Sequence, residues 1–190
     1  MLDDDLRSRL MSGERILWSG QPLRGLLLTS RDIFLVPFSL IWCGGAIVWE
    51  AAVLGLLNRA GAHSHAPFFF ALWGVPFVLV GLYFVFGRFI TDALIRRRTI
   101  YGITDKRVLI LRDGIFNKVV ALNIDRLPEI AISERTSGRG TIIFGPNPSL
   151  RMQPGVSGFL PSLEATPRFL EIENARSVFD QIQRLAAPRK

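Results

Sequence analysis

The sequence predicts an α+β membrane protein in which a two-helix transmembrane hairpin precedes an antiparallel β-sandwich or barrel capped by a C-terminal helix. Three observations favour this fold class. The 190-residue chain holds two long apolar runs, then short apolar stretches broken by turn residues, and finally an amphipathic stretch near its end.

The charge of the chain is concentrated outside the apolar runs. The net charge is +7, to which residues 1–32 contribute 0, residues 33–90 contribute +1 and residues 91–190 contribute +6. A basic chain invites a nucleic-acid interpretation. However, the basic residues cluster beside the apolar runs and aromatic residues are sparse on the predicted strands, so we expect no nucleic-acid partner. The single cysteine, Cys43, excludes an intrachain disulfide and a cysteine-based zinc cluster.

Two apolar runs are each long enough to cross a bilayer. The first, residues 33–57, has Glu50 as its one acidic side chain and no basic one, and as a helix it reaches about 37 Å against about 30 Å of hydrocarbon. The second run, within residues 67–90, holds about 20 uncharged residues. Buried helices of a soluble protein are the alternative, but too little polar sequence remains to cover them. We therefore expect two transmembrane helices joined by an external linker, residues 58–66.

Basic residues on either side of the runs set the expected orientation. The cytoplasmic N-terminal segment, residues 1–32, and the segment after the second run carry several arginines, whereas the linker carries only Arg59. The positive-inside bias then places both termini in the cytoplasm and makes the chain a multi-pass protein of the cytoplasmic membrane. The first run is longer than the apolar region of a signal peptide, so we expect no cleavage.

The first run also carries small residues and one carboxylate. The small residues are predicted to form a face for close approach of the second helix; they are Gly44, Gly45, Ala51 and Gly55. An ionised Glu50 at this depth is costly, which suggests a partner or a role, although a protonated or snorkelling carboxyl near Arg59 is the alternative. Glu50, Ala51 and Gly55 are therefore the candidate contacts for a partner helix within the membrane.

Residues 91–190 predict a domain of antiparallel strands. Strands are expected at residues 101–104, 107–111, 118–124, 129–134, 141–144 and 168–172. The dipeptide Asp113–Gly114 and residues 137–140 are turn signals. Residues 175–185 place apolar side chains at helical spacing, so this helix should close one end of the sandwich. Upstream, residues 2–11 suit a short helix, and Trp18 is expected near the membrane or at the domain surface.

Three segments resemble those of a known family. They are GERILWSGQP at residues 13–22, YGITDKRVLILRDG at residues 101–114 and SGRGTIIFG at residues 137–145. The chain resembles the bacterial pleckstrin-homology-like (PH-like) membrane proteins of the two-span type. The resemblance covers nearly the whole chain and implies a PH-like sandwich without a catalytic site. Residues 146–167 depart from the family pattern, because they are longer than a hairpin needs.

Five basic residues follow the second run closely and are the candidate contacts for lipid or protein partners. They are Arg96, Arg97, Arg98, Lys106 and Arg107. Such juxtamembrane clusters attract anionic head groups by about 1 kcal/mol per residue. The plain alternative is that they only orient the span. The resemblance places Lys106 and Arg107 at the turn of the first hairpin, through which many eukaryotic PH domains bind phosphoinositides. It does not imply that this chain binds the same ligand. Residues 146–167 are a further candidate binding loop.

The sequence offers no catalytic, cofactor or metal site. His63 and His65 lie in the linker without further ligands, and Ser64 between them has no acidic partner nearby. We therefore expect a non-catalytic, membrane-anchored binding or scaffold module that contacts protein partners or anionic lipid head groups. The alternative is an accessory subunit of a membrane transporter or envelope enzyme complex, using Glu50. The oligomeric state, including a homo-oligomer, stays open.

Overall fold

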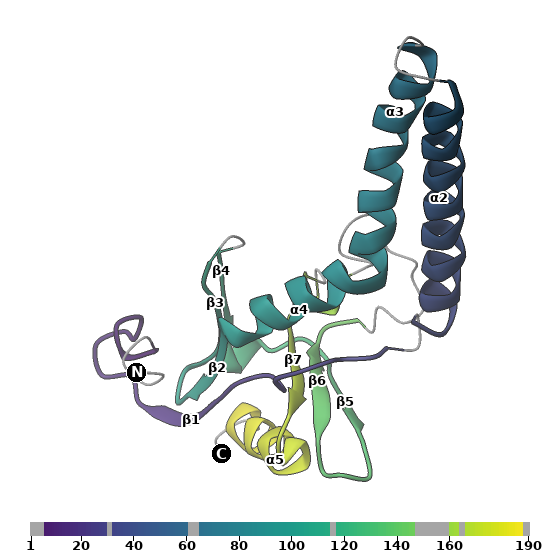
Figure 1. The fold of residues 1–190 in the computed structure, drawn as a ribbon. Coiled ribbons are helices and arrows are strands. Elements are labelled where there is room, and N and C mark those ends of the chain that lie inside the picture. Colours follow the sequence, from purple (N-terminus) through teal and green to yellow (C-terminus); the bar gives the residue numbers. More distant parts are fainter. Residues whose placement is uncertain are drawn as a thin grey trace. The chain divides into compact units, whose positions relative to one another are not determined.

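The computed structural model describes residues 6–29, 32–60, 65–114, 117–146, 160–163 and 166–187. The chain divides into two compact units. One combines Met1–Leu26 with Asp92–Lys190, and the other is Leu27–Thr91. The apolar unit is therefore inserted into the chain of the other unit, and the colours of Figure 1 follow this order along the sequence.

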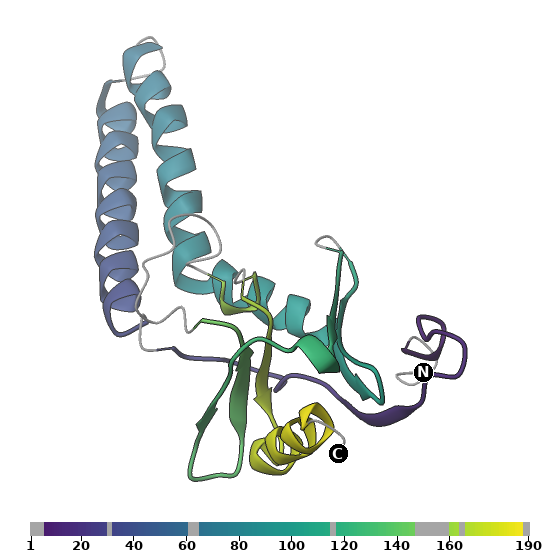
Figure 2. The same cartoon turned by 180° about the vertical axis from the view of Figure 1, so that it is seen from behind.

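The apolar unit is a pair of neighbouring helices, α2 (Asp32–Ala60) and α3 (His65–Leu82). They lie side by side in both Figure 1 and Figure 2. A π-helical turn, Tyr83–Gly87, continues α3 into α4 (Arg88–Arg97). By length and composition, Asp32–Gly55 and Phe69–Arg97 qualify as candidate membrane spans, and only 17% and 11% of their most apolar windows are buried. The two helices thus turn most of their apolar side chains outward.

Glycines of the second helix allow the two helices to approach. A Cβ atom on Gly81 would lie 2.9 Å from the Cα of Cys43, and one on Gly74 would collide with the Glu50 carboxylate. A Cβ on Gly44, Gly45 or Gly55 would meet nothing within 4 Å, and Ala51 is exposed. The predicted close-approach face on the first helix is therefore wrong. The spacing of small residues along α2 does not indicate which face of α2 packs on α3. The packed face is the one whose larger side chains, Cys43 and Glu50, lie against glycines of α3.

An ion pair in the apolar unit joins the first residue of α2 to the first residue of α4. The backbone N–H and the hydroxyl of Thr29 donate to Asp32 Oδ2 at 2.6 and 2.8 Å, at the first residue of α2. Arg88 Nη1 lies 2.7 Å from the other oxygen, Asp32 Oδ1, and the two side chains are 3% and 8% exposed. The start of α4 is thereby joined to the start of α2.

The other unit contains two antiparallel sheets (Figure 2). The first has the order β1-β2-β3-β4: Ile16–Gly20, Thr99–Thr104, Arg107–Arg112 and Lys118–Asn123. The second has the order β5-β6-β7: Ile130–Glu134, Gly140–Phe144 and Arg168–Ile172. Short 3-10 helices occupy Ile124–Arg126 and Pro161–Leu163, and α5 (Ala175–Ala186) follows β7. All six predicted strands and the final helix are confirmed, with shifts of a few residues at their ends.

The strand β1 is the main departure from the prediction. It pairs with β2, so that Trp18 lies opposite Ile103 and Gly20 lies opposite Tyr101. The sequence pattern predicts residues 1–32 as a segment apart from the domain of residues 91–190, whereas in the structure β1 and β2 belong to one sheet. Trp18 stacks on Phe169 of β7 at 5.6 Å between ring centroids. Its indole therefore packs against the core of this domain.

The core lies between the two sheets and α5. Phe169 is fully buried, with ring centroids 4.5 Å from Tyr101 and 5.1 Å from Phe144. The helix α5 contributes the buried side chains Ala175, Val178, Phe179 and Ile182. Burial of each large apolar side chain stabilises the fold by about 1.5–3 kcal/mol. The predicted closing role of the C-terminal helix is confirmed by these contacts.

Candidate binding surface

The β2–β3 pair separates the predicted basic residues into two groups. Thr99 lies opposite Arg112 at one end of the pair, and Ile103 lies opposite Val108 near the other. Arg96, Arg97 and Arg98 precede the first end, whereas Lys106 and Arg107 follow β2 at the second. A six-residue strand separates its ends by roughly 17 Å. The five residues therefore do not form one patch.

The turn that holds Lys106 is not the first hairpin of the domain. Because β1 precedes β2 in the sheet, the first hairpin connection runs from Gly20 to Thr99 and contains the whole apolar unit. Lys106 and Arg107 belong to the connection between β2 and β3. The position that the resemblance gives them is therefore wrong. The sequence pattern missed β1, so β2 was taken as the first strand of the domain.

Arg107 is engaged in a buried ion pair. Its Nε and Nη2 atoms donate to the two carboxylate oxygens of Glu14 at 2.8 and 2.9 Å. The same carboxylate accepts from the Thr104 hydroxyl and the Met11 backbone N–H, each at 2.7 Å. Burial alone would raise the pKa of Glu14, but these hydrogen bonds and the charge of Arg107 together lower its pKa to about 2. Arg107 thus ties the N-terminal segment to the β2–β3 turn.

Arg96 is also engaged within the domain. Its Nε donates to Asp92 Oδ2 at 2.9 Å, and Nη1 and Nη2 donate to the carbonyls of Leu23 and Gly25, both at 2.6 Å. The residue is 2% exposed. Arg96 therefore joins the segment after β1 to α4, which leads into β2. Because its side chain is buried, a lipid head group outside the domain cannot reach it.

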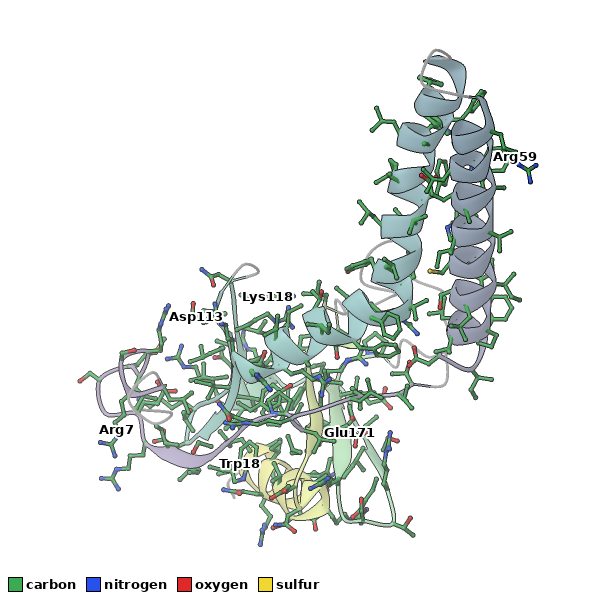
Figure 3. The ribbon with its side chains drawn as sticks, viewed as in Figure 1. Arg7, Trp18, Arg59, Asp113, Lys118 and Glu171 are labelled. Carbon is green, nitrogen blue, oxygen red and sulfur yellow. The ribbon has the colours of Figure 1, made fainter. Side chains whose placement is uncertain are left out.

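Among the described residues, three exposed basic side chains remain at this end of the sheet: Arg97, Arg98 and Lys118. We call these three residues the basic end. The Arg98 side chain packs on Gly114 in the β3–β4 turn. The backbone carbonyl of Arg98 accepts a hydrogen bond from the Asp113 N–H at 3.0 Å. Figure 3 shows Lys118 near Asp113 on the β3–β4 hairpin. Lys118 was not named from the sequence as a candidate contact, because it appears there only as a strand residue. The Asp113–Gly114 turn could have indicated it, since this turn brings Lys118 opposite Arg112.

A small cavity opens between the two sheets beside Lys118. Its described lining residues are Tyr101, Ile110, Arg112, Lys118, Val120, Ser162, Thr166, Pro167, Arg168 and Leu170. We call it the mouth pocket. Arg112 donates a hydrogen bond to the Ser162 carbonyl. Arg112 and Arg168 were also missed, because their strands β3 and β7 meet at this pocket only in the folded domain.

Within the apolar unit, Glu50 faces the neighbouring helix. Its carboxylate lies against Gly74 of α3, and its Oε2 atom is buried without a hydrogen-bond partner among the described residues. Ala51 and Gly55 are exposed on α2. Arg59 is exposed as well and points away from both helices in Figure 3. The three residues predicted for a partner helix are therefore not all on one exposed face.

Other predicted features fall partly outside the described residues. These include His63, Ser64 and most of residues 146–167. His65 is the first residue of α3. Within the described ranges, no three His, Cys, Asp or Glu side chains come together as a metal site.

Two antiparallel sheets with a C-terminal helix are the architecture of a PH-like domain. A family model described as "Bacterial PH domain" matches residues 38–186. The chain belongs to this bacterial PH domain family. The match starts inside α2 and ends with α5, so it includes the apolar helices and leaves β1 outside. No curated protein and no solved structure gives a match. PH domains are generally non-catalytic binding modules.

Proposed function

We propose that this chain is a membrane-anchored binding module whose basic end contacts anionic lipid head groups at the cytoplasmic face. The helices of residues 33–57 and 67–90 cross the membrane, residues 58–66 lie outside, and residues 1–32 and 91–190 lie in the cytoplasm. One observation carries the proposal: the exposed side chains of the basic end gather where both chain connections to the apolar unit leave the β1–β2 pair.

The magnitudes suit contact by a tethered domain. Each basic residue near an anionic surface contributes about 1 kcal/mol, so the basic end contributes about 3 kcal/mol. This attraction fades within a Debye length of about 8 Å at physiological salt. β2 begins at Thr99, two residues after α4 ends at Arg97. Along the chain, the basic end therefore begins at Arg97, the last residue of the second candidate span.

Hydrogen exchange of the full chain in nanodiscs tests this function. Peptides covering the β3–β4 turn should exchange more slowly in discs of phosphatidylcholine with phosphatidylglycerol than in phosphatidylcholine alone. High salt should remove this protection. The double variant Arg97→Gln/Lys118→Gln should also remove it, while Arg98, which packs on Gly114, is kept.

Lys106→Gln is the matched control, because Lys106 is exposed and lies at the opposite end of β2–β3. It should keep the protection seen for the wild-type chain. Equal exchange in both kinds of disc, or an equal loss in Lys106→Gln, would contradict head-group contact by the basic end.

A second candidate function is that of an accessory subunit in a membrane complex. The buried Oε2 of Glu50, which has no hydrogen-bond partner among the described residues, and the exposed Ala51 and Gly55 on the same helix favour it. A partner helix would then cover the exposed Ala51 and Gly55, and Glu50 would act at the contact between α2 and α3. Retention of every co-purifying protein by Glu50→Gln, after gentle extraction from native membranes, would argue against this candidate.

A further inference from the structure

We propose that one face of α4 lies against the hydrocarbon of the bilayer, so that contact with lipid continues past residue 90, where the second membrane helix is predicted to end. This face carries Ile90, Leu94 and Arg97, and we call it the outer face of α4. The inference deepens the proposed function and rests on it, because it requires that the apolar unit crosses a membrane. The occupant of the outer face is lipid rather than a second copy of the chain or another protein.

The first argument is that the outer face is apolar and exposed. Ile90 and Leu94 are 60% and 53% exposed. They are four residues apart in α4, so they lie on the same side of the helix. A helix at the surface of a soluble protein buries its apolar side chains and turns charged ones toward water. The outer face of α4 has the reverse arrangement.

The second argument is that the opposite side of α4 buries its charges. Arg88, Asp92 and Arg96 recur every four residues and are only 2–4% exposed. Arg88 pairs with Asp32 at 2.7 Å, and the Asp92 carboxylate accepts from Arg96 Nε at 2.9 Å and from the Ser162 N–H at 3.0 Å. These charges are compensated inside the protein, which lowers the cost of placing α4 beside hydrocarbon. A hydropathy pattern counts them against a longer span, although the fold removes them from the outer face.

Continuity with the second candidate span indicates what covers the outer face. By length and composition this span runs from Phe69 to Arg97, so it contains all of α4. Phe86, four residues before Ile90, is exposed as well. The same hydrocarbon that surrounds the exposed side chains before α4 would therefore cover the outer face. Arg97 ends the face, and its long side chain can reach water while its stem stays in apolar surroundings.

A second segment brings another exposed leucine to α4. Arg96 Nη2 donates to the Gly25 carbonyl at 2.6 Å. Leu26, the next residue in the chain, is exposed. Arg96 thus holds an apolar side chain of the N-terminal flank near the helix that carries Leu94. Exposed apolar side chains gathered from separate segments mark a surface that is covered by lipid or protein rather than by water.

Spin labelling of the full chain in nanodiscs of phosphatidylcholine alone tests the inference. In a Cys43→Ala background, a nitroxide is attached at Leu94→Cys. Its relaxation by oxygen, which concentrates in hydrocarbon, is compared with its relaxation by a water-soluble nickel chelate. Oxygen should be at least threefold more effective than the chelate. Ile90→Cys, one turn earlier, repeats the measurement on an independent variant and should give at least the same ratio.

Two further labels calibrate the ratio. Leu79→Cys, at an exposed position of α3, should give the value for lipid. Gln183→Cys, at an exposed position of α5, should give the value for water. A ratio at Leu94→Cys or Ile90→Cys equal to that at Gln183→Cys would overturn the inference. Exclusion of both reagents would also overturn it, because protein would then cover the outer face.

The same labels separate a failure of this inference from a failure of the proposed function. Water at Leu94→Cys together with lipid at Leu79→Cys would remove only the contact of α4 and leave the membrane anchor in place. Water at Leu79→Cys would contradict the anchor, and the inference with it. The lipid ratio at Leu94→Cys should persist at high salt, because hydrocarbon contact involves no charge. Head-group contact by the basic end should instead disappear at high salt.

Discussion

At Glu14, one carboxylate holds together segments that are far apart in the chain. Its partner Arg107 is 93 residues away, and Arg96 reaches the carbonyls of Leu23 and Gly25 across 73 and 71 residues. The sequence named both arginines as head-group contacts, because an arginine beside an apolar run looks the same whether it is paired or free. Their partners come from the N-terminal segment, which lies beside them only because β1 pairs with β2. The structural roles of Arg96 and Arg107 could therefore not be predicted from the sequence.

The lowered pKa of Glu14 predicts a loss of stability in acid. The value is about 2 in the fold against an ordinary 4.5, so the carboxylate stabilises the domain above pH 4.5 and this contribution disappears as the pH falls to 2. The loss amounts to about 3 kcal/mol. Amide exchange of β1 and β2, corrected for the intrinsic rate at each pH, measures it. Glu14→Gln should abolish this pH dependence.

Glu134→Gln is the control for this measurement, because Glu134 is exposed on β5. It should retain the acid sensitivity of the wild-type chain. If Glu14→Gln kept the same dependence between pH 4.5 and 2, another group would be responsible for it.

At the scale of elements, the strands of the domain could be predicted because their alternation is local. The exception, β1, is five residues long with Trp18 at its centre, and its partner β2 follows about 80 residues later, after the apolar unit. The helices α2 and α3 were predictable from length and hydropathy. Their contact was not, because it depends on glycines of α3 meeting Cys43 and Glu50 of α2.

The α2–α3 contact gives a prediction with an internal control. Gly81→Ala places a methyl group 2.9 Å from the Cys43 Cα, so the helices must shift, at a cost of about 1–3 kcal/mol. Gly44→Ala meets nothing within 4 Å and should be neutral. The midpoint of thermal unfolding in detergent should fall for Gly81→Ala only. Equal midpoints for the two variants would show that the helices do not pack at Gly81.

At the scale of the whole molecule, the chain begins the domain, leaves it for the apolar unit and returns to finish it. Pairing of β1 with β2 requires residues 16–20 and 99–104 to lie on the same side of any membrane that the apolar unit crosses. The positive-inside bias makes the same prediction from charge alone. Topology therefore connects the fold of the domain to its proposed place at the cytoplasmic face.

Cysteine accessibility in intact spheroplasts tests whether both flanks of the apolar unit lie in the cytoplasm. In a Cys43→Ala background, Ser12→Cys, Ser137→Cys and Ser64→Cys are each treated with a membrane-impermeant maleimide; Ser12 and Ser137 are exposed on the two flanks, and Ser64 lies in the linker. Ser64→Cys alone should be labelled before lysis, and the two flank cysteines should be labelled only after lysis. Labelling of either flank in intact spheroplasts would contradict this topology.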